Sequence, residues 1–120
     1  MYKSNVREDC IFCKIVNKQI PADFVYLNDE VVAFNDINPQ APVHIIIIPK
    51  AHIEKVSDLD LEHRDLITDL ILTANELAKK KNIAESGYRL VVNCNKDAGQ
   101  AVAHLHLHLL GGRKMNWPPG

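Results

Sequence analysis

Apolar residues along the chain follow two different periods, and together these predict a mixed α and β fold. Short runs rich in β-branched and aromatic residues, typical of strands, occupy residues 23–27, 31–34, 43–48, 88–93 and 104–110. Turn-forming residues separate the first three runs, so we expect those strands to form an antiparallel meander. The period becomes helical from about Asp58 to Lys81. The sequence therefore predicts an α+β domain with about five antiparallel strands and one long helix packed on one face.

The predicted helix carries acidic residues near its start and lysines at its end, the distribution that the helix dipole favours. Its apolar residues form one stripe, which we expect to pack against the sheet. The stripe consists of Leu66, Ile67, Leu70, Ile71, Ala74, Leu77 and Ala78.

Length and charge narrow the possible functions. The 120 residues fit a single domain at 1–120, and residues 113–120 read as a tail. Fourteen Lys and Arg against fifteen Asp and Glu give a net charge of -1, so no basic field is available to bind nucleic acid. No apolar stretch approaches the roughly 18–20 residues that span a bilayer, and residues 1–5 lack the apolar core of a signal peptide. We therefore expect a cytoplasmic protein without a membrane partner.

Three of the six histidines form the pattern H-x-H-x-H at His104, His106 and His108. Alternation along a strand would place these imidazoles on one face, about 6.6–6.8 Å apart at Cα, and the intervening leucines on the core face. Each charged imidazole opposes charging of the next, so at least one should stay neutral near pH 7, available as a nucleophile or metal ligand. His44 would join this face if its strand lies beside the last one. The alternative is a solvent face that happens to use histidine.

Two shorter motifs also suggest chemistry. The polar loop at 93–101 leads into the histidines, and its backbone N–H groups could hold an anion such as phosphate. Cys10 and Cys13 form a C-x-x-C pair, which favours metal or redox chemistry over a secreted disulfide framework. Cys94 stands alone, and we expect a small buried side chain beside a strand.

The histidine motif and its surroundings resemble the histidine triad (HIT) family, specifically its Hint branch of nucleoside phosphoramidases. The resemblance includes Ala98-Gly99-Gln100 before the histidines, GGRKMNWPPG after them, and ordered motifs at 11–15, 33–37, 39–42, 48–52 and 88–93. It implies a HIT-like fold and a homodimer. It also implies hydrolysis of purine nucleoside 5′-phosphoramidates, of the AMP-NH2 or AMP-lysine type, or of acyl-nucleotides, through a nucleotidyl-histidine. That chemistry requires no cofactor.

The resemblance implies a role for each histidine of the site. His106 would attack the α-phosphorus, and His108 would contact the phosphate. His44 would lie near the leaving group or orient the nucleophile, and His104 would complete the catalytic set.

Nucleotide-binding residues are implied in the same way. Asp36 would hold the ribose hydroxyls, while Phe12 and Ile37 would form apolar walls of the base pocket. The residues implied beside the phosphate are Asn93, Gly99, Gln100 and Ala101, together with His106 and His108. Judged from the residues alone, Asp36 could equally form a turn, and Phe12 and Ile37 could belong to the core.

Two positions depart from the common Hint pattern. Ala101 replaces a serine, and the lost donor would cost about 1–3 kcal/mol of transition-state stabilisation and slow turnover. The C-x-x-C pair is shared with a zinc-carrying subset of the family. The ligands implied for a structural zinc are Cys10, Cys13, His52 and His104, a Cys2His2 set suited to tetrahedral coordination. A redox pair or two incidental thiols are the alternatives.

The tail and the overall function each leave more than one interpretation. Trp117 and the two prolines after it should dock, either on the same subunit or, as the resemblance implies, near the partner's active site. One rival function is a zinc hydrolase that uses three histidines as ligands around an open water site. The other is a non-catalytic nucleotide-binding module, for which Ala101 is the sequence indication.

Overall fold

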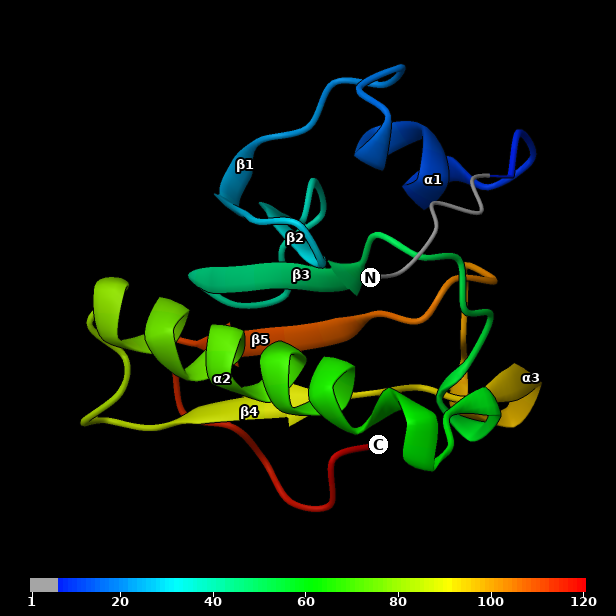
Figure 1. Cartoon of the computed structure of the whole chain (residues 1–120). Coiled ribbons are helices and arrows are strands. Elements are labelled where there is room, and N and C mark those ends of the chain that lie inside the picture. Colours follow the sequence, from blue (N-terminus) through cyan, green and yellow to red (C-terminus); the bar gives the residue numbers. More distant parts are fainter. Residues whose placement is uncertain (1–6) are drawn as a thin grey trace.

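A five-stranded antiparallel sheet forms the centre of the protein, whose computed structural model describes residues 7–120 (Figure 1). The sheet order is β1-β2-β3-β5-β4, and every neighbouring pair is antiparallel. The strands are β1 (Phe24–Leu27), β2 (Val31–Asn35), β3 (Val43–Pro49), β4 (Tyr88–Val91) and β5 (Leu107–Gly111). The predicted α+β class and the meander of the first three strands are confirmed. The expectation about residues 1–5 lies outside the described residues.

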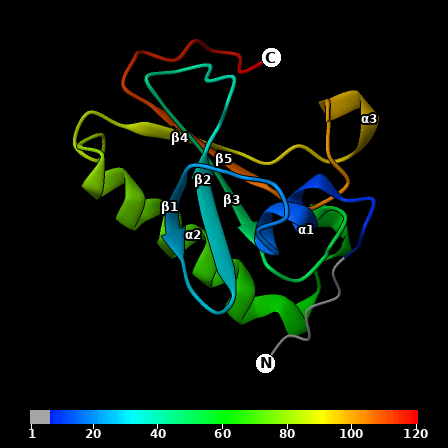
Figure 2. The same cartoon turned by 90° about the horizontal axis from the view of Figure 1, so that it is seen from above.

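Helices cover both faces of the sheet (Figure 2). The long helix α2 (Arg64–Lys80) packs on one face against residues such as Ile45, Ile47 and Leu109. The short helix α1 (Ile11–Val16), which the sequence analysis did not predict, packs on the other face against Ile46 and Ile48. Because β3 is covered on both sides, its sequence is a continuous apolar run without alternation. No helix within residues 7–120 has the length and apolar character needed to cross a membrane.

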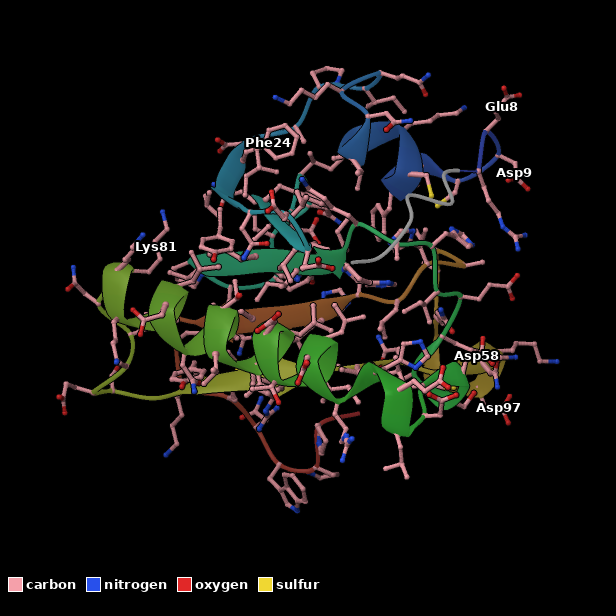
Figure 3. The ribbon with its side chains drawn as sticks, viewed as in Figure 1. Glu8, Asp9, Phe24, Asp58, Lys81 and Asp97 are labelled. Carbon is pink, nitrogen blue, oxygen red and sulfur yellow. The ribbon has the colours of Figure 1, made fainter. Side chains whose placement is uncertain are left out.

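The long helix begins later than predicted. Two 3-10 turns, η1 (Val56–Asp58) and η2 (Leu61–His63), precede α2. The Asp60 side chain accepts a hydrogen bond from the Glu62 N–H and the His63 ring accepts one from the Asp60 N–H, so this segment forms a capped turn before the helix. In Figure 3, Asp58 and Asp97 are drawn at one end of the molecule and Lys81, which follows α2, at the opposite end.

The predicted helix stripe is only partly buried. Its line through Leu66, Leu70 and Leu77 is buried in the core, but Ile67 is 38% and Ile71 is 40% exposed. The expectation that these two isoleucines face the sheet was wrong, because they lie on the edge of the helix that points away from it.

The histidine strand also begins later than predicted. The ladder between β3 and β5 ends where Ile47 pairs with Leu107, so His104 and His106 precede the strand, with His104 in a bend. Pro49 ends β3 and has no N–H to extend the ladder. Its carbonyl oxygen lies 2.9 Å from Nε2 of His104, so a side chain takes the place of the missing strand pairing.

Candidate active site

His44, His106 and His108 meet on the face of the sheet that α1 covers. His44 on β3 and His108 on β5 lie on paired strands, with His44 Nε2 2.9 Å from His108 Nδ1. The rings of His106 and His108 have centroids 5.1 Å apart. The prediction that His44 joins the triad face is confirmed. His104 is the exception, because it is fully buried and its ring faces two cysteine sulfurs.

The hydrogen bond of His106 fixes its tautomer. Its Nδ1 lies 2.7 Å from the carbonyl oxygen of His104. A carbonyl oxygen can only accept, so Nδ1 must carry the hydrogen, and Nε2 of the neutral ring keeps a free lone pair. His106 also lines the apolar cleft described below. The residue that the sequence favoured as the nucleophile thus has a nucleophilic nitrogen held in place by its neighbour's backbone.

A second chain of hydrogen bonds fixes His44 and His108. The Gln40 N–H donates to Nδ1 of His44 over 3.0 Å, so the hydrogen of the neutral His44 ring is on Nε2. That Nε2–H faces Nδ1 of His108 at 2.9 Å, with Asp36 Oδ2 at 3.4 Å as a further acceptor. Donation to His108 Nδ1 leaves the hydrogen of His108 on its own Nε2. This arrangement makes His108 a donor towards an anion in the cleft.

The pKa values of these histidines support neutral rings. Burial, helped by the neighbouring His106 and His44 rings, lowers the pKa of His108 to about 4. Burial also lowers the pKa of His44, against the opposing pull of the Asp36 carboxylate. Two of the clustered imidazoles are therefore uncharged at pH 7, as the sequence analysis expected for at least one.

Asp36, His44 and His108 place one possible ligand atom each within 4.8 Å of one another. The hydrogen-bond pattern argues against a metal at this point. The Gln40 N–H occupies Nδ1 of His44, so a metal at Nε2 would have to displace the ring's only hydrogen. We read these three residues as a hydrogen-bonded relay.

An apolar cleft of about 260 Å³ opens beside His106 and His108. Six of the residues predicted for the site line it, namely Phe12, Asp36, Ile37, Ala101, His106 and His108. Ile37 is fully exposed at the rim, so it is not a core residue. The two carboxylate oxygens of Asp36 have different partners. Oδ1 accepts a hydrogen bond from the Asn38 N–H over 2.8 Å, which closes a turn, while Oδ2 faces His44.

Three other predicted residues, Asn93, Gly99 and Gln100, do not line this cleft. Asn93 follows β4 two residues beyond Val91, which pairs with His108. Gly99 ends the four-residue helix α3 (Asn95–Ala98) with a left-handed φ of 82°. The Gln100 amide bonds to backbone, donating to the Glu54 and Val102 carbonyls and accepting the Asn95 N–H. The Gln100 side chain therefore holds the loop in place. Cys94 precedes α3 and is only partly buried, contrary to expectation.

The four predicted metal ligands, Cys10, Cys13, His52 and His104, form a second cluster. Sγ of Cys10 lies 3.4 Å from Nδ1 of His104, and Sγ of Cys13 lies 3.2 Å from Nδ1 of His52 and 3.6 Å from that of His104. All four side chains are buried. The sequence separates these residues by up to 94 positions, and the fold brings all of them together.

The chemistry of this cluster fits a metal. Ligand atoms at about 2.0–2.3 Å from a tetrahedral zinc lie about 3.3–3.8 Å apart, close to the separations found here. Nε2 of His104 donates to the Pro49 carbonyl, which leaves Nδ1 unprotonated and directed at the sulfurs. Burial raises the pKa of the Cys13 thiol and lowers that of His104 to about 4. A bound cation would offset the cost of a buried thiolate.

Several residues of the site were missed by sequence reasoning. The cleft is also lined by Ile11, Ile15 and Phe34, which lie on α1 and β2. The spacing of Ile11, Phe12 and Ile15 is that of a helix face, a signal that the short α1 segment contained. The Gln40 N–H and the His104 and Pro49 carbonyls are backbone groups, so no side-chain pattern indicates them.

The lowered pKa of His108 predicts a pH-dependent stability. As the pH falls from about 6.5 to about 4, the unfolded chain takes up a proton at His108 that the folded protein does not. The free energy of unfolding should therefore decrease over this range, by about 1–3 kcal/mol from this group. Urea unfolding of wild type and His108→Asn across this range measures it. The variant should lose less stability on acidification, and an unchanged pH dependence would contradict the burial argument.

Comparison with known proteins agrees with this geometry. The model of the HIT domain family matches residues 17–115. Over 108 residues, the chain is 49% identical to the purine nucleoside phosphoramidase of Escherichia coli strain K12, covering 90% of this chain and 91% of that protein. It is 50% identical to an uncharacterized HIT-like protein of Synechococcus elongatus, covering 94% and 98%. The crystal structure of a HIT family hydrolase from Legionella pneumophila superposes with a TM-score of 0.92 at 48% identity, covering 93% of this chain and 100% of that one. The chain is a member of the histidine triad family.

Proposed function

We propose that this protein hydrolyses purine nucleoside 5′-phosphoramidates, and related acyl-nucleotides, through a nucleotidyl intermediate on His106. The observation that carries the proposal is the 2.7 Å contact from His106 Nδ1 to the His104 carbonyl, which leaves Nε2 unprotonated beside a nucleotide-sized cleft. The E. coli relative, a purine nucleoside phosphoramidase, indicates the substrate class.

The reaction follows from the hydrogen positions. Nε2 of His106 attacks the α-phosphorus, forming an N–P bond as the bond to the leaving amine or carboxylate breaks. The Nε2–H of His108 donates to a phosphate oxygen as charge develops there, and His44 keeps His108 in the donating tautomer. An amine leaving group takes a proton from water. Water then attacks phosphorus, releases the nucleoside monophosphate and returns the lone pair to His106.

The cleft supports the nucleotide-binding roles. Phe12 contacts the His106 ring edge to face, with centroids 5.2 Å apart, so it can stack beside a purine next to the nucleophile. Ile37 at the rim can cover the base, and Asp36 can accept hydrogen bonds from ribose hydroxyls. Asn93 and the backbone of Gly99 and Gln100 complete the phosphate side. Ala101 offers no hydroxyl in the cleft. The missing donor costs about 1–3 kcal/mol of transition-state stabilisation, which slows turnover.

The histidine positions do not favour a tri-histidine metal hydrolase. His104 faces the cysteines, and His106 Nδ1 is bonded to backbone, so the triad rings do not converge on one point. A non-catalytic nucleotide-binding module shares the same cleft, and the following experiment separates it from an enzyme.

Replacement of the nucleophile tests the proposed reaction. Wild type mixed briefly with adenosine 5′-phosphoramidate should gain one adenylyl mass and release AMP. His106→Asn should do neither, because the asparagine side chain has no nucleophilic nitrogen, with turnover reduced by about 10³-fold or more. Intact-mass spectrometry and AMP release are measured on both proteins. The matched control is His63→Asn, which alters a histidine of η2 and should keep wild-type turnover. Binding of AMP without adduct or product in wild type would support the non-catalytic module.

We also propose that the Cys10, Cys13, His52 and His104 cluster binds one zinc ion with a structural role. The zinc would tie α1 to the end of β3 and the segment before β5, since the ligands come from all three. Elemental analysis of purified protein should give about one zinc per chain. Cys13→Ser should lose the metal and lower the melting temperature, whereas Cys94→Ser should retain both. A full complement of zinc in Cys13→Ser would contradict this ligand set.

A homodimer of single HIT domains in the cytoplasm is the assembly and location that we propose. Its support is exposed apolar side chains at Ile67 and Ile71 on α2 and at Val92, which directly follows the edge strand β4. The tail is held on its own subunit by Arg89, which donates to the Asn116 carbonyl over 2.9 Å, while Trp117 is 84% exposed and could reach a partner. Sedimentation equilibrium should give twice the chain mass, and Ile71→Lys should shift it towards monomer. A monomeric wild type would contradict the proposal.

A further inference from the structure

We propose that the Cys10, Cys13, His52 and His104 cluster, when it holds a metal, positions the nucleophile and the base-contacting wall of the cleft in addition to fastening the fold. The proposal deepens the proposed function and rests on it. It makes the four ligands positioning residues of the active site, because they act on the substrate only through His106 and Phe12.

The first link is His104, whose ring belongs to the cysteine and histidine cluster and whose backbone carbonyl bonds to the nucleophile His106. Its ring nitrogen Nδ1 points at the sulfurs of Cys10 and Cys13, at 3.4 and 3.6 Å. Its backbone carbonyl accepts the Nδ1–H of His106 over 2.7 Å. The peptide that carries this carbonyl lies outside the β-ladder, and its N–H, that of Leu105, donates to the Ile53 carbonyl over 2.6 Å, directly after His52 in the chain. The direction of the carbonyl therefore depends on groups attached to two of the ligands, His104 and His52. A ligated ring would hold that carbonyl, and therefore His106, in one orientation.

The second link is Phe12, which lies between the two cysteines in α1. Cys10 is the N-cap of this helix, and its sulfur accepts the Cys13 N–H over 3.3 Å. Phe12 packs edge to face on both His104 and His106, with ring centroids 5.9 and 5.2 Å away. Because α1 has only six residues, its place on the sheet depends on side-chain contacts more than on helix propensity. Ligation of the two cysteines would fix Phe12 against the nucleophile.

The third link is His52, which is not among the residues that line the nucleotide cleft. It contacts the cluster through Cys13 Sγ at 3.2 Å and through the His104 ring, with centroids 5.0 Å apart. His52 lines a neighbouring hollow together with Arg7, Asp9 and Glu54. This hollow shares lining residues such as Ala101 with the nucleotide cleft, but His52 itself does not line the cleft. Substitution at His52 therefore reports on the metal without removing a group that touches the nucleotide.

The experiment compares wild type loaded with zinc, wild type stripped by a chelator, stripped protein reloaded with zinc, and His52→Ala, with Cys94→Ser as the matched control. Three quantities are measured on protein whose circular dichroism shows it folded. They are zinc content, AMP affinity by calorimetry, and the single-turnover rate of adenylyl adduct formation. We expect the stripped protein and His52→Ala to form adduct about 10 to 100-fold more slowly and to bind AMP several-fold more weakly. Zinc should restore the stripped wild type but not His52→Ala.

Retention of AMP affinity and adduct rate within about twofold in folded, metal-free protein would overturn the proposal. The cluster would then have a purely structural role. Failure of wild type to take up zinc would overturn it as well. If His52→Ala does not fold, Cys10→Ser replaces it, because this variant also removes one ligand and Cys10 does not line the nucleotide cleft. Failure of the proposed function looks different, since zinc-loaded wild type would then form no adduct at all.

Discussion

One hydrogen bond, from Nδ1 of His106 to the carbonyl oxygen of His104, determines the chemistry of this protein. At 2.7 Å it fixes the hydrogen of the neutral ring on Nδ1. It also holds the orientation of the ring, so that the unprotonated Nε2 is the nitrogen left for the cleft. The bond can form because both histidines precede the first paired residue of β5, Leu107. The His104 carbonyl is therefore not used in the β-ladder and can accept from a side chain. Pro49 creates this gap by ending β3. The site therefore depends on where a strand stops as much as on the histidines themselves.

The doubly covered sheet places this bond in a dry and crowded environment. The α2 face supplies the main core, and the α1 face holds the histidines beside Phe12 and the buried cysteines. Burial lowers the pKa of His44 and His108, which keeps both rings neutral and lets a single pattern of hydrogens persist. The same burial raises the pKa of the Cys13 thiol, so that thiol is costly to ionise without a cation. Catalytic and metal-binding groups thus share one layer of the molecule.

Much of this could be predicted from the sequence, and the rest could not for identifiable reasons. Strand periodicity indicated the five strands, and the H-x-H-x-H spacing predicted that His106 and His108 share a face. His44 joins them through the pairing of β3 with β5, whereas the His104 ring turns to the cysteines. The late start of α2 was missed because the acidic residues that suggest a helix start instead cap a 3-10 turn at Asp60. The role of Gln100 was missed because its side chain binds backbone groups far away in the sequence, such as the Glu54 carbonyl. Local patterns reveal period and composition, whereas these contacts depend on the tertiary path of the chain.

The position of the hydrogen on the His106 ring is the most direct test of this account. Long-range proton–nitrogen correlation spectra of the ¹⁵N-histidine-labelled protein at mildly alkaline pH report the protonated nitrogen of each neutral ring, and the His106→Asn variant assigns the signal. The account predicts that His106 carries its hydrogen on Nδ1, with Nε2 unprotonated. A hydrogen on Nε2 would leave no lone pair facing the cleft and would contradict the nucleophilic role of His106.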